Sequence, residues 1–490
     1  MKIISPDLET RKKVLGNIDP YSIEYQGIIR TFTDKTAFIV PEYVHVFEKK
    51  GKFFILNAMN LKKIWGDTDI LNFFMEVSSL GIFDKNKFLY SVLTKDEAET
   101  LYQNHFVIKK DDDNTFFTSG CNTKNFKELN YIFDNLHIFL SNNIPLWNVK
   151  VNKHKNMDIK KLDTVLKKFL TEEKKNEINH DSEKISGHHN HHQKNKIYKL
   201  IFYSDSSNEN WEAFTKTFDN IVQRKYGNHN IALRLVTPVN LLNPDRINFL
   251  RASNVLLSVY QKDDPAVWEK NIKLLKEASE KIGPRLEVVF NTKKPNKNLI
   301  NSIIKFTKKE INSSSIRINI LNDMKGLTGE KKADYLLELF DVCKKNNINE
   351  NIISINYRNF FEEKSYETWI PDYSVPIAVS PSADMGFCRS SILEGKNVAL
   401  RSTDFSEKKI KASKEFLKLK NKIPLLQEIC RSCFAVGICR GGCISNYEFD
   451  KKGNMISLDK EHCDFMLKVF RTFTDEYFKQ VPKPEIKEKK

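Results

Sequence analysis

The sequence has few cysteines and no long apolar run, and these shortages exclude several classes of protein. Eight cysteines among 490 residues are far fewer than small disulfide-stapled secreted domains carry. No segment approaches the roughly 18 uninterrupted apolar residues of a membrane-spanning helix, and the opening MKIISPDLETRKK has no apolar signal-peptide core. We therefore expect a cytoplasmic protein without a membrane segment, whose clustered cysteines are ligands or catalytic thiols rather than disulfides.

Common catalytic and nucleic-acid-binding patterns are missing as well. No G-x-S-x-G elbow and no H-E-x-x-H helix occurs, so hydrolase and zinc-protease functions lack support. The 79 Lys and Arg against 63 Asp and Glu give a net charge of +16, but the excess comes from scattered lysines without an arginine-rich stripe interleaved with aromatics. The charge favours a solvated surface and an acidic partner over nucleic acid.

A polar tract divides the chain. Residues 171–196 contain five histidines and only two aliphatic side chains, too little apolar surface to offset the entropy of ordering. These histidines could hold a metal loosely, but no other ligand lies at a fixed spacing beside them. The predicted regions are an N-terminal domain (1–150), a His-rich linker (151–196), an α/β region (197–375), a cysteine-bearing domain (376–475) and a basic tail (476–490).

The N-terminal region has the pattern of a compact α+β domain. Residues 43–47 and 53–57 flank a turn and predict a β-hairpin. A helix follows from residue 71, then a second over 95–104 that Thr94 and Glu97 can cap, and then an apolar strand at 105–108. This winged-helix-like order resembles the RiPP recognition element, a relative of the pyrroloquinoline-quinone biosynthesis chaperone. The resemblance implies binding of a leader peptide as an added strand, although a winged helix without a ligand has the same order.

The region after the tract alternates strands with amphipathic helices, which predicts parallel right-handed βαβ units. Six such units predict an α/β fold of the partial (βα)6 barrel type. A doubly wound sheet is the alternative, but no glycine-rich phosphate loop follows any strand. The predicted strands are 197–203, 231–236, 255–259, 286–291, 316–321 and 352–357, and the predicted helices include 212–226, 267–282, 299–310 and 331–345.

Most of the cysteines lie near the C-terminal end. Cys430, Cys433, Cys439 and Cys443 have the spacing C-x2-C-x5-C-x3-C, and Cys463 follows. A C-x2-C turn brings two sulfurs to the same side, and Gly437, Gly441 and Gly442 let the backbone fold tightly round an inorganic core. Four thiolates can hold one [4Fe-4S] cluster or one structural zinc ion, and the missing second C-x2-C favours the cluster.

The same residues carry a family resemblance. The spacing, the pentapeptide CRGGC, the EHC ending in Cys463 and the upstream SADMGFC ending in Cys388 resemble the SPASM domain of radical S-adenosylmethionine enzymes that mature peptides and sulfatases. The resemblance implies that Cys430, Cys433, Cys439 and Cys463 bind one [4Fe-4S] cluster, with Cys388 and Cys443 in the positions of a second. This chain departs from the family at Leu400, five residues after Gly395, where another Cys is expected. Cys343 is a candidate substitute.

The resemblance also implies a radical-SAM-type barrel, and there the chain departs further. The family's C-x3-C-x2-C motif belongs in the loop after the first barrel strand, where three thiolates hold the cluster that cleaves S-adenosylmethionine. The loop 204–209 after the first predicted strand reads SDSSNE, and no cysteine occurs between Cys121 and Cys343. Hydroxyl and carboxamide groups do not replace soft thiolates. The chain therefore resembles a pseudo-radical-SAM protein, and S-adenosylmethionine is not an expected cofactor.

Two functions are compatible with these observations. The first is an accessory protein of ribosomal peptide maturation that binds a precursor (leader) peptide and one [4Fe-4S] cluster, working beside an intact radical SAM enzyme or an ATP-grasp ligase. The second is an active oxidoreductase-type maturase that uses the remaining cluster directly, with an open iron near Cys388 and Cys443. A structural zinc protein is a further alternative.

Overall fold

The structure is a computed structural model of the 490-residue chain. It describes residues 2–4, 38–65, 68–80, 82–83, 93, 95–109, 130–142, 144, 146, 155–171, 197–227, 229–262, 264–311, 315–321, 324, 326–363, 372–401, 404–421, 430, 432–439, 441, 448–449, 455–457 and 459–482. Among these, no helix is long and apolar enough to cross a membrane. Most of the His-rich tract, together with Thr94, Cys121, Cys443 and the tail after residue 482, lies outside the described residues.

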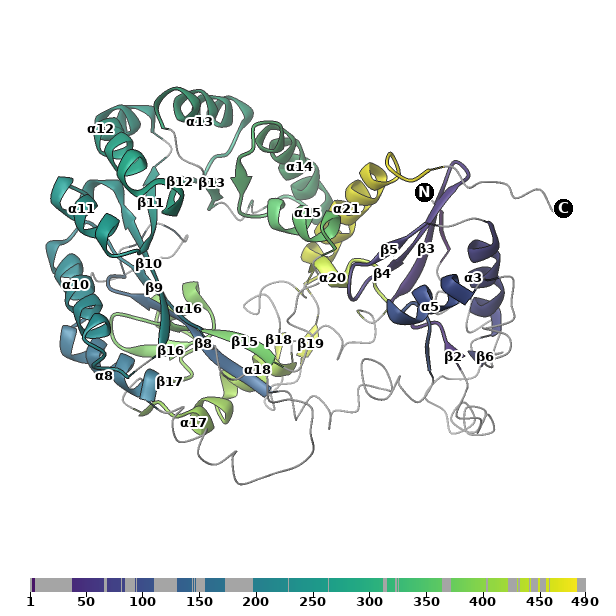
Figure 1. The fold of residues 1–490 in the computed structure, drawn as a ribbon, viewed down its shortest axis with the longest axis horizontal. Helices are drawn as coiled ribbons and strands as arrows, with labels where there is room; N and C mark the ends of the chain where they lie inside the picture. The colour runs from purple at the N-terminus through teal and green to yellow at the C-terminus, as the bar shows by residue number, and fades with distance from the viewer. Residues whose placement is uncertain are drawn as a thin grey trace.

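A large, mostly parallel sheet dominates the molecule (Figure 1). Its ten strands follow the order β14-β13-β12-β11-β10-β9-β8-β15-β16-β17, and only β16 and β17 run antiparallel to their neighbours. The strands are β8 (Asn130–Phe139), β9 (Ile197–Tyr203), β10 (Asn230–Pro238), β11 (Leu256–Lys262), β12 (Leu286–Thr292), β13 (Ser315–Ile320), β14 (Asn349–Glu350), β15 (Asp372–Val379), β16 (Asp384–Gly386) and β17 (Leu400–Arg401). The prediction of an α/β fold with a parallel sheet is confirmed.

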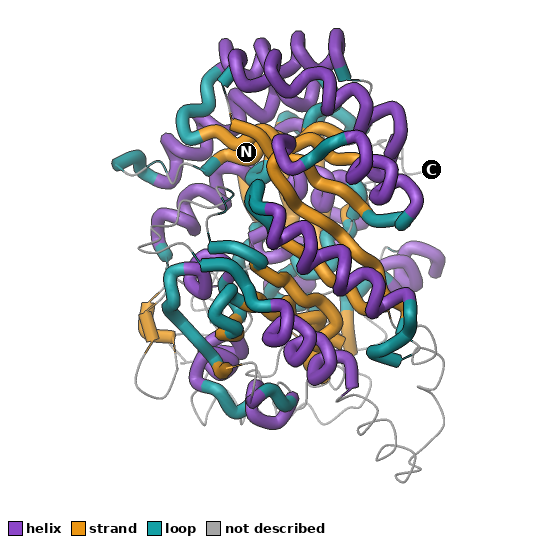
Figure 2. The backbone as a smooth tube through the Cα atoms, turned by 90° about the vertical axis from the view of Figure 1, so that its left-hand side faces the viewer, coloured by secondary structure: helices purple, strands orange, loops and turns teal. Residues whose placement is uncertain are grey.

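The sheet curves into an arc, with helices along its convex side (Figures 1 and 2). Each helix connects two neighbouring parallel strands, because a parallel connection needs a crossover. Apolar residues on both faces of the central strands match this burial on two sides. The helices in chain order are α8 (Ile159–Thr171), α10 (Asn208–Val222), α11 (Pro244–Ala252), α12 (Pro265–Ile282), α13 (Lys297–Glu310) and α14 (Gly329–Lys345).

Two features of the sheet correct the sequence-based prediction. The parallel series begins with β8, which pairs with β9 from Asn135↔Lys199 to Phe139↔Tyr203; it therefore starts before the predicted boundary at residue 150. Residues 352–357 were predicted as the sixth strand, and this is wrong, because helix α15 (Ser354–Phe361) begins there. The Glu350 carboxylate accepts backbone N–H bonds from Ile352 and Ile353 at 2.6 Å each, which caps the helix start.

The N-terminal region contains the predicted hairpin. Strands β3 (Val44–Lys49) and β4 (Lys52–Asn57) pair in antiparallel register, and Lys50 and Gly51 both have positive φ, as a two-residue hairpin turn requires. The strand order is β1-β3-β4-β5, with β1 (Lys2–Ile4) and β5 (Lys63–Ile64) at the edges.

The two predicted N-terminal helices are confirmed as α3 (Thr68–Leu80) and α5 (Lys95–Gln103). A second, three-stranded sheet lies in this region, in the order β6-β2-β7, formed by β6 (Ile82–Phe83), β2 (Phe38–Ile39) and β7 (Ile108–Lys109). Whether this arrangement is a winged-helix recognition domain stays a prediction.

The long C-terminal helix α21 (Lys460–Tyr477) lies between the N-terminal sheet and the large sheet's helices α14 and α15 (Figure 1). Phe54 packs edge-on against Tyr477 and Phe478, with ring centroids 5.0 Å apart in both cases. Lys49 Nζ lies 2.7 Å from the Asp475 carboxylate. The N-terminal and C-terminal parts of the chain therefore share one apolar core.

A buried lysine strengthens this contact between distant parts of the chain. Lys63 Nζ donates to the carbonyl oxygens of Leu61 at 2.8 Å and Phe360 at 2.6 Å, and it lies 3.4 Å from the Glu363 carboxylate. Burial lowers the pKa of Lys63 to about 8, although Glu363 acts in the opposite direction. The ammonium group joins β5 to α15 at a cost in solvation that its partners offset only in part.

Candidate metal centre

Four of the predicted ligands come from two segments that pack together. Cys433 follows Cys430 through a turn in which Cys433 N donates to Cys430 O at 3.2 Å. Cys439 ends the short helix α20 (Val436–Cys439), and Cys463 lies in the first turn of α21, where Asp459 caps the helix by accepting a bond from His462 N at 3.0 Å. All four are free thiols that are neither fully exposed nor fully buried.

The electrostatics place these four sulfurs in one neighbourhood. Burial and, to a smaller extent, the nearby Cys433, Cys463 and Cys430 raise the pKa of the Cys439 thiol to about 12. Burial, with smaller contributions from Cys433 and Cys463, likewise raises the pKa of Cys430 to about 12. Groups influence one another in this way only when they lie close together. The spacing motif and the helix α21 therefore deliver their cysteines to a common site.

Backbone N–H groups lie near two of the sulfurs. Burial raises the pKa of the Cys433 thiol, and the N–H groups of Ala435 and Val436 act in the opposite direction, as the Gly441 N–H does at Cys439. Gly441 has a φ of 71°, a conformation that glycine adopts without strain. In composition, the four thiols match the ligands of a [4Fe-4S] cluster or of a zinc ion.

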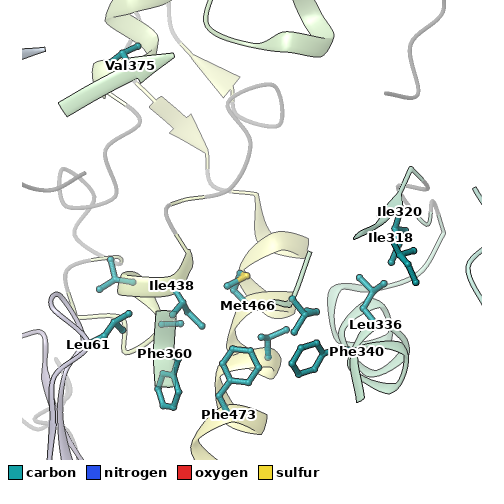
Figure 3. Packing of buried hydrophobic residues seen from close by; sticks show 14 of the residues in the cluster. Leu61, Ile318, Ile320, Leu336, Phe340, Phe360, Val375, Ile438, Met466 and Phe473 are labelled. Atoms are coloured by element: carbon teal, nitrogen blue, oxygen red, sulfur yellow. The ribbon is translucent and has the colours of Figure 1, made fainter. Parts of the chain in front are cut away.

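The thiol site lies directly against the N-terminal sheet. A Cβ added to Gly437 in α20 would come within 2.1 Å of the Ala58 carbonyl oxygen and 2.7 Å of Leu61 Cδ2. Figure 3 shows Leu61 beside Ile438 of α20. Phe434, next to Cys433, packs edge-on against Phe47 with ring centroids 6.1 Å apart. The turn between β4 and β5 is therefore part of the wall that supports the thiols.

The other cysteines lie apart from this group or outside the described residues. Cys388 is the residue before helix α16 (Arg389–Leu393), which lies within the arc of the large sheet (Figure 1). Its sulfur lies 3.3 Å from Ser390 Oγ. Cys343 is fully buried in the main apolar core on α14, where burial raises the pKa of its thiol to about 12. Cys443 is not described. A second cluster formed by Cys388 and Cys443 stays a prediction.

The described residues contain no group of three or more His, Cys, Asp or Glu side chains arranged to hold a metal ion. The thiols of the candidate site influence one another, but they do not form a compact single-ion cage. In such a cage, a zinc ion with Zn–S bonds of about 2.3 Å would hold its sulfurs about 3.8 Å apart.

The loops at the ends of the first two parallel strands contain no cysteine. Since β8 precedes β9, the loop after the first strand is 140–158 rather than 204–209, and neither loop contains cysteine. Within 204–209, Asp205 Oδ1 accepts bonds from Ser207 N at 2.9 Å and Asn210 Nδ2 at 2.7 Å, while Ser207 caps α10. This loop thus serves to start a helix.

Apolar side chains occupy the concave face of the sheet near these loops. Ile144 and Leu146, from the loop after β8, join a buried cluster with Ile392 and Leu393 of α16. Inward-facing strand residues complete the cluster, namely Phe139, Tyr203, Val236, Tyr260, Val289 and Ala378. The Leu146 carbonyl accepts a bond from Asn319 Nδ2 at 3.2 Å, which fixes the loop to β13. The concave face is a packed core at this level.

Sequence reasoning missed the polar residues beside this cluster. His137 Nδ1 lies 2.8 Å from the Tyr203 hydroxyl, and Arg389 also hydrogen-bonds to Tyr203. Burial, together with the charge of Arg389, lowers the pKa of His137 to about 3, so the imidazole is neutral. The only sequence signal was the alternation in β8 of polar with apolar residues, which places His137 on the concave face.

Comparisons with known proteins give distant structural similarities. No family model and no curated protein matches the chain. Native anSMEcpe with bound AdoMet and Kp18Cys peptide is 14% identical, over 70% of this chain and 99% of its own, with a TM-score of 0.48. Streptococcus suis SuiB bound to precursor peptide SuiA is 12% identical, over 83% of this chain and 96% of its own, with a TM-score of 0.41. SuiB bound to S-adenosylmethionine, also 12% identical, covers 86% and 99% with a TM-score of 0.45. Similarity at this level does not assign the chain to a family.

Proposed function

We propose that this chain is a non-catalytic, radical-SAM/SPASM-like protein that binds a precursor peptide during ribosomal peptide maturation. The observation that carries the proposal is the convergence of Cys430, Cys433, Cys439 and Cys463 beside the N-terminal sheet. Their spacing matches the SPASM pattern, and four thiols suffice for one [4Fe-4S] cluster. Such a cluster would supply a one-electron redox centre next to a peptide-recognition domain.

The proposal of a non-catalytic role rests on the missing cysteines in the loop after β8. Cleavage of S-adenosylmethionine in the resembled family needs three thiolates in the loop after the first strand. Residues 140–158 contain none, and two of their side chains, Ile144 and Leu146, are packed into the apolar cluster on the concave face.

Peptide binding is supported by the form of the N-terminal sheet. Within the described residues, β5 ends the four-stranded sheet. A strand added at its outer edge would take the place of the Glu363 carboxylate, which accepts a bond from Lys63 N at 3.2 Å. Trp65 directly follows β5 and is 49% exposed, and an exposed indole beside this edge offers the apolar contact that added strands use for specificity. The partner that modifies the peptide would be an intact radical SAM enzyme or an ATP-grasp ligase.

Co-expression tests peptide binding. The tagged chain is produced with each short peptide encoded beside its gene, purified anaerobically, and the retained peptide is quantified by mass spectrometry. We expect stoichiometric retention of one peptide and a several-fold loss in Trp65→Ala. Val222→Ala is the matched control, since Val222 is 61% exposed at the end of α10. Failure of every neighbouring peptide to bind, or equal retention by both variants, would contradict the recognition role of this edge.

A further inference from the structure

A group of arginines lies on the concave face of the large sheet, below the apolar cluster. Arg234 and Glu287 precede the cluster residues Val236 and Val289 by two positions on their strands, so they lie on the same face, nearer the strands' N-terminal ends. Arg317 is paired with Val289 across β12 and β13. Three strands thus bring these side chains together.

Glu287 is shared by both arginines. Its Oε2 atom accepts a bond from Arg317 Nη2 at 3.1 Å and lies 3.9 Å from Arg234 Nη1. The same oxygen also accepts a bond from Ser258 Oγ at 2.8 Å. One carboxylate oxygen therefore serves two guanidinium groups that carry five N–H donors each. The Nε atom of Arg317 is buried and has no hydrogen-bond partner.

Arg389 lies near the same strands. It begins α16, whose Ile392 and Leu393 belong to the apolar cluster. Burial raises the pKa of Tyr203, and Arg389, Arg317 and Arg234 all act in the opposite direction.

The Arg234 and Arg317 side chains are accessible from the N-terminal ends of their strands. The apolar cluster closes the side toward the strands' C-terminal ends. The side chains of Arg234 and Arg317 are 38% and 37% exposed, whereas that of Glu287 is 19% exposed. Ile197 and Leu256, at the N-terminal ends of β9 and β11, are exposed as well. An anion can therefore reach the guanidinium groups without disturbing the core.

We propose that Arg234 and Arg317 form a binding site for a small oxyanion, carried as a phosphate or carboxylate group, on the concave face of the sheet. Planar guanidinium groups bind such oxygens through paired, charge-assisted hydrogen bonds. The ligand supplies the acceptors that Glu287 alone does not, Arg317 Nε included. The site is independent of the thiol centre and of the proposed peptide edge.

Thermal unfolding of the full, anaerobically purified chain tests the site with inorganic phosphate and with citrate as probes. Each is compared with sodium chloride at matched ionic strength. A ligand that binds the native state raises the Tm. At concentrations well above Kd, the stabilisation grows with the logarithm of the ligand concentration divided by Kd. Both anions also stabilise proteins through exclusion from the surface, so the comparison between variants decides. A response to phosphate alone identifies a phosphate group, and a response to citrate alone identifies carboxylates.

The decisive variant is Arg317→Gln, with Arg251→Gln, an exposed arginine at the end of α11, as the matched loss of one positive charge. We expect Arg251→Gln to keep the Tm rise of the wild type and Arg317→Gln to lose most of it. Equal rises in both variants, or no rise beyond chloride in the wild type, would overturn the site.

Glu287→Gln keeps the test decisive if Arg317→Gln does not fold. Removing the competing carboxylate should tighten anion binding several-fold, and the anion should restore the variant's Tm toward that of the wild type. If the arginines serve only to pair with Glu287, the variant is less stable and responds to phosphate and citrate no more than the wild type does. That result would contradict the proposal.

Discussion

The thiol site and the concave face of the sheet differ in the side chains that they bring together. At the thiol site, four cysteines from two segments converge beside backbone N–H donors and the N-terminal sheet. On the concave face, the loop after β8 contributes Ile144 and Leu146 to a packed apolar cluster. Soft metal ligands gather in the first region and are missing from the loops of the second. The difference teaches that one chain can gather thiols in one region while apolar side chains fill the other.

The largest expected effect is on iron and sulfide content, which should depend on the thiol site and not on the concave face of the sheet. The wild-type chain, purified anaerobically, should contain about four irons and four sulfides per chain. Cys439→Ala should lose nearly all of both, because its sulfur lies among the other three. Colorimetric iron and sulfide assays with metal analysis by mass spectrometry measure this.

Cys388→Ser is the matched control, since its thiol lies at α16 instead. It should keep the wild-type content of iron and sulfide. Equal iron loss in both variants would refute the assignment of ligands, and stoichiometric zinc without sulfide would refute the cluster.

The next effect tests how tightly the thiol site depends on the N-terminal sheet. Gly437→Ala should lower the free energy of unfolding by about 3 to 5 kcal/mol, because the added Cβ meets a backbone oxygen and buried Leu61. Iron content should fall with it. Denaturant unfolding measures the loss. Gly395→Ala is the control, because Gly395 follows α16 in a left-handed turn with a φ of 71° and open space around its Cβ, so only about 1 kcal/mol of backbone strain is expected. A similar cost in both variants would argue against close support of the thiols.

Leu146→Ala tests the packed concave face. Leu146 is 7% exposed within the apolar cluster, so truncation should cost about 3 kcal/mol of unfolding free energy through lost burial and a residual cavity. Iron content should stay unchanged. Leu417→Ala, at a residue 40% exposed, should cost much less in the same denaturant titration. A negligible cost at Leu146 would mean that this face is open rather than filled.

The smallest effect is a pH dependence of the unfolding free energy that arises from Lys63, at the contact between β5 and α15. Lys63 has a folded-state pKa of about 8 against 10.5 when unfolded. Between these values the unfolded chain binds the extra proton, so stability rises with pH over this window and is lost as pH falls toward 8. Relative to Lys63→Met, the wild type should gain about 2 to 3 kcal/mol from pH 8 to 10.5. Parallel stability curves for the two proteins would show that Lys63 is not desolvated.

Short-range signals predicted much of the fold. Lys50-Gly51 between two β-rich runs located the hairpin, and helices such as α12 and α14 follow their apolar periodicity. The cysteine spacing predicted that Cys430 and Cys433 lie close together, because a C-x2-C turn is a local structure; their role as ligands stays a prediction. The part played by α21 in bringing Cys463 to the thiol site was implied by the resemblance alone.

Features that depend on distant parts of the chain were missed. Strand β8 mixes Asn135 and His137 with apolar residues, and a long polar stretch separates it from β9, so its membership of the sheet shows only in the pairing register. Residues 352–357 are rich in β-formers, but the Glu350 carboxylate caps a helix there. The arginine group has no sequence signature, because Arg234 and Arg317 come from different strands, β10 and β13.

Formation of 5′-deoxyadenosine tests the central claim most directly. The iron-loaded chain is incubated anaerobically with S-adenosylmethionine and a strong reductant, and the product is quantified against Cys439→Ala as background. We predict no product above that background, because residues 140–158 and 204–209 contain no thiol to hold a catalytic cluster. Multiple turnovers of deoxyadenosine per chain would contradict the account and make this protein an enzyme.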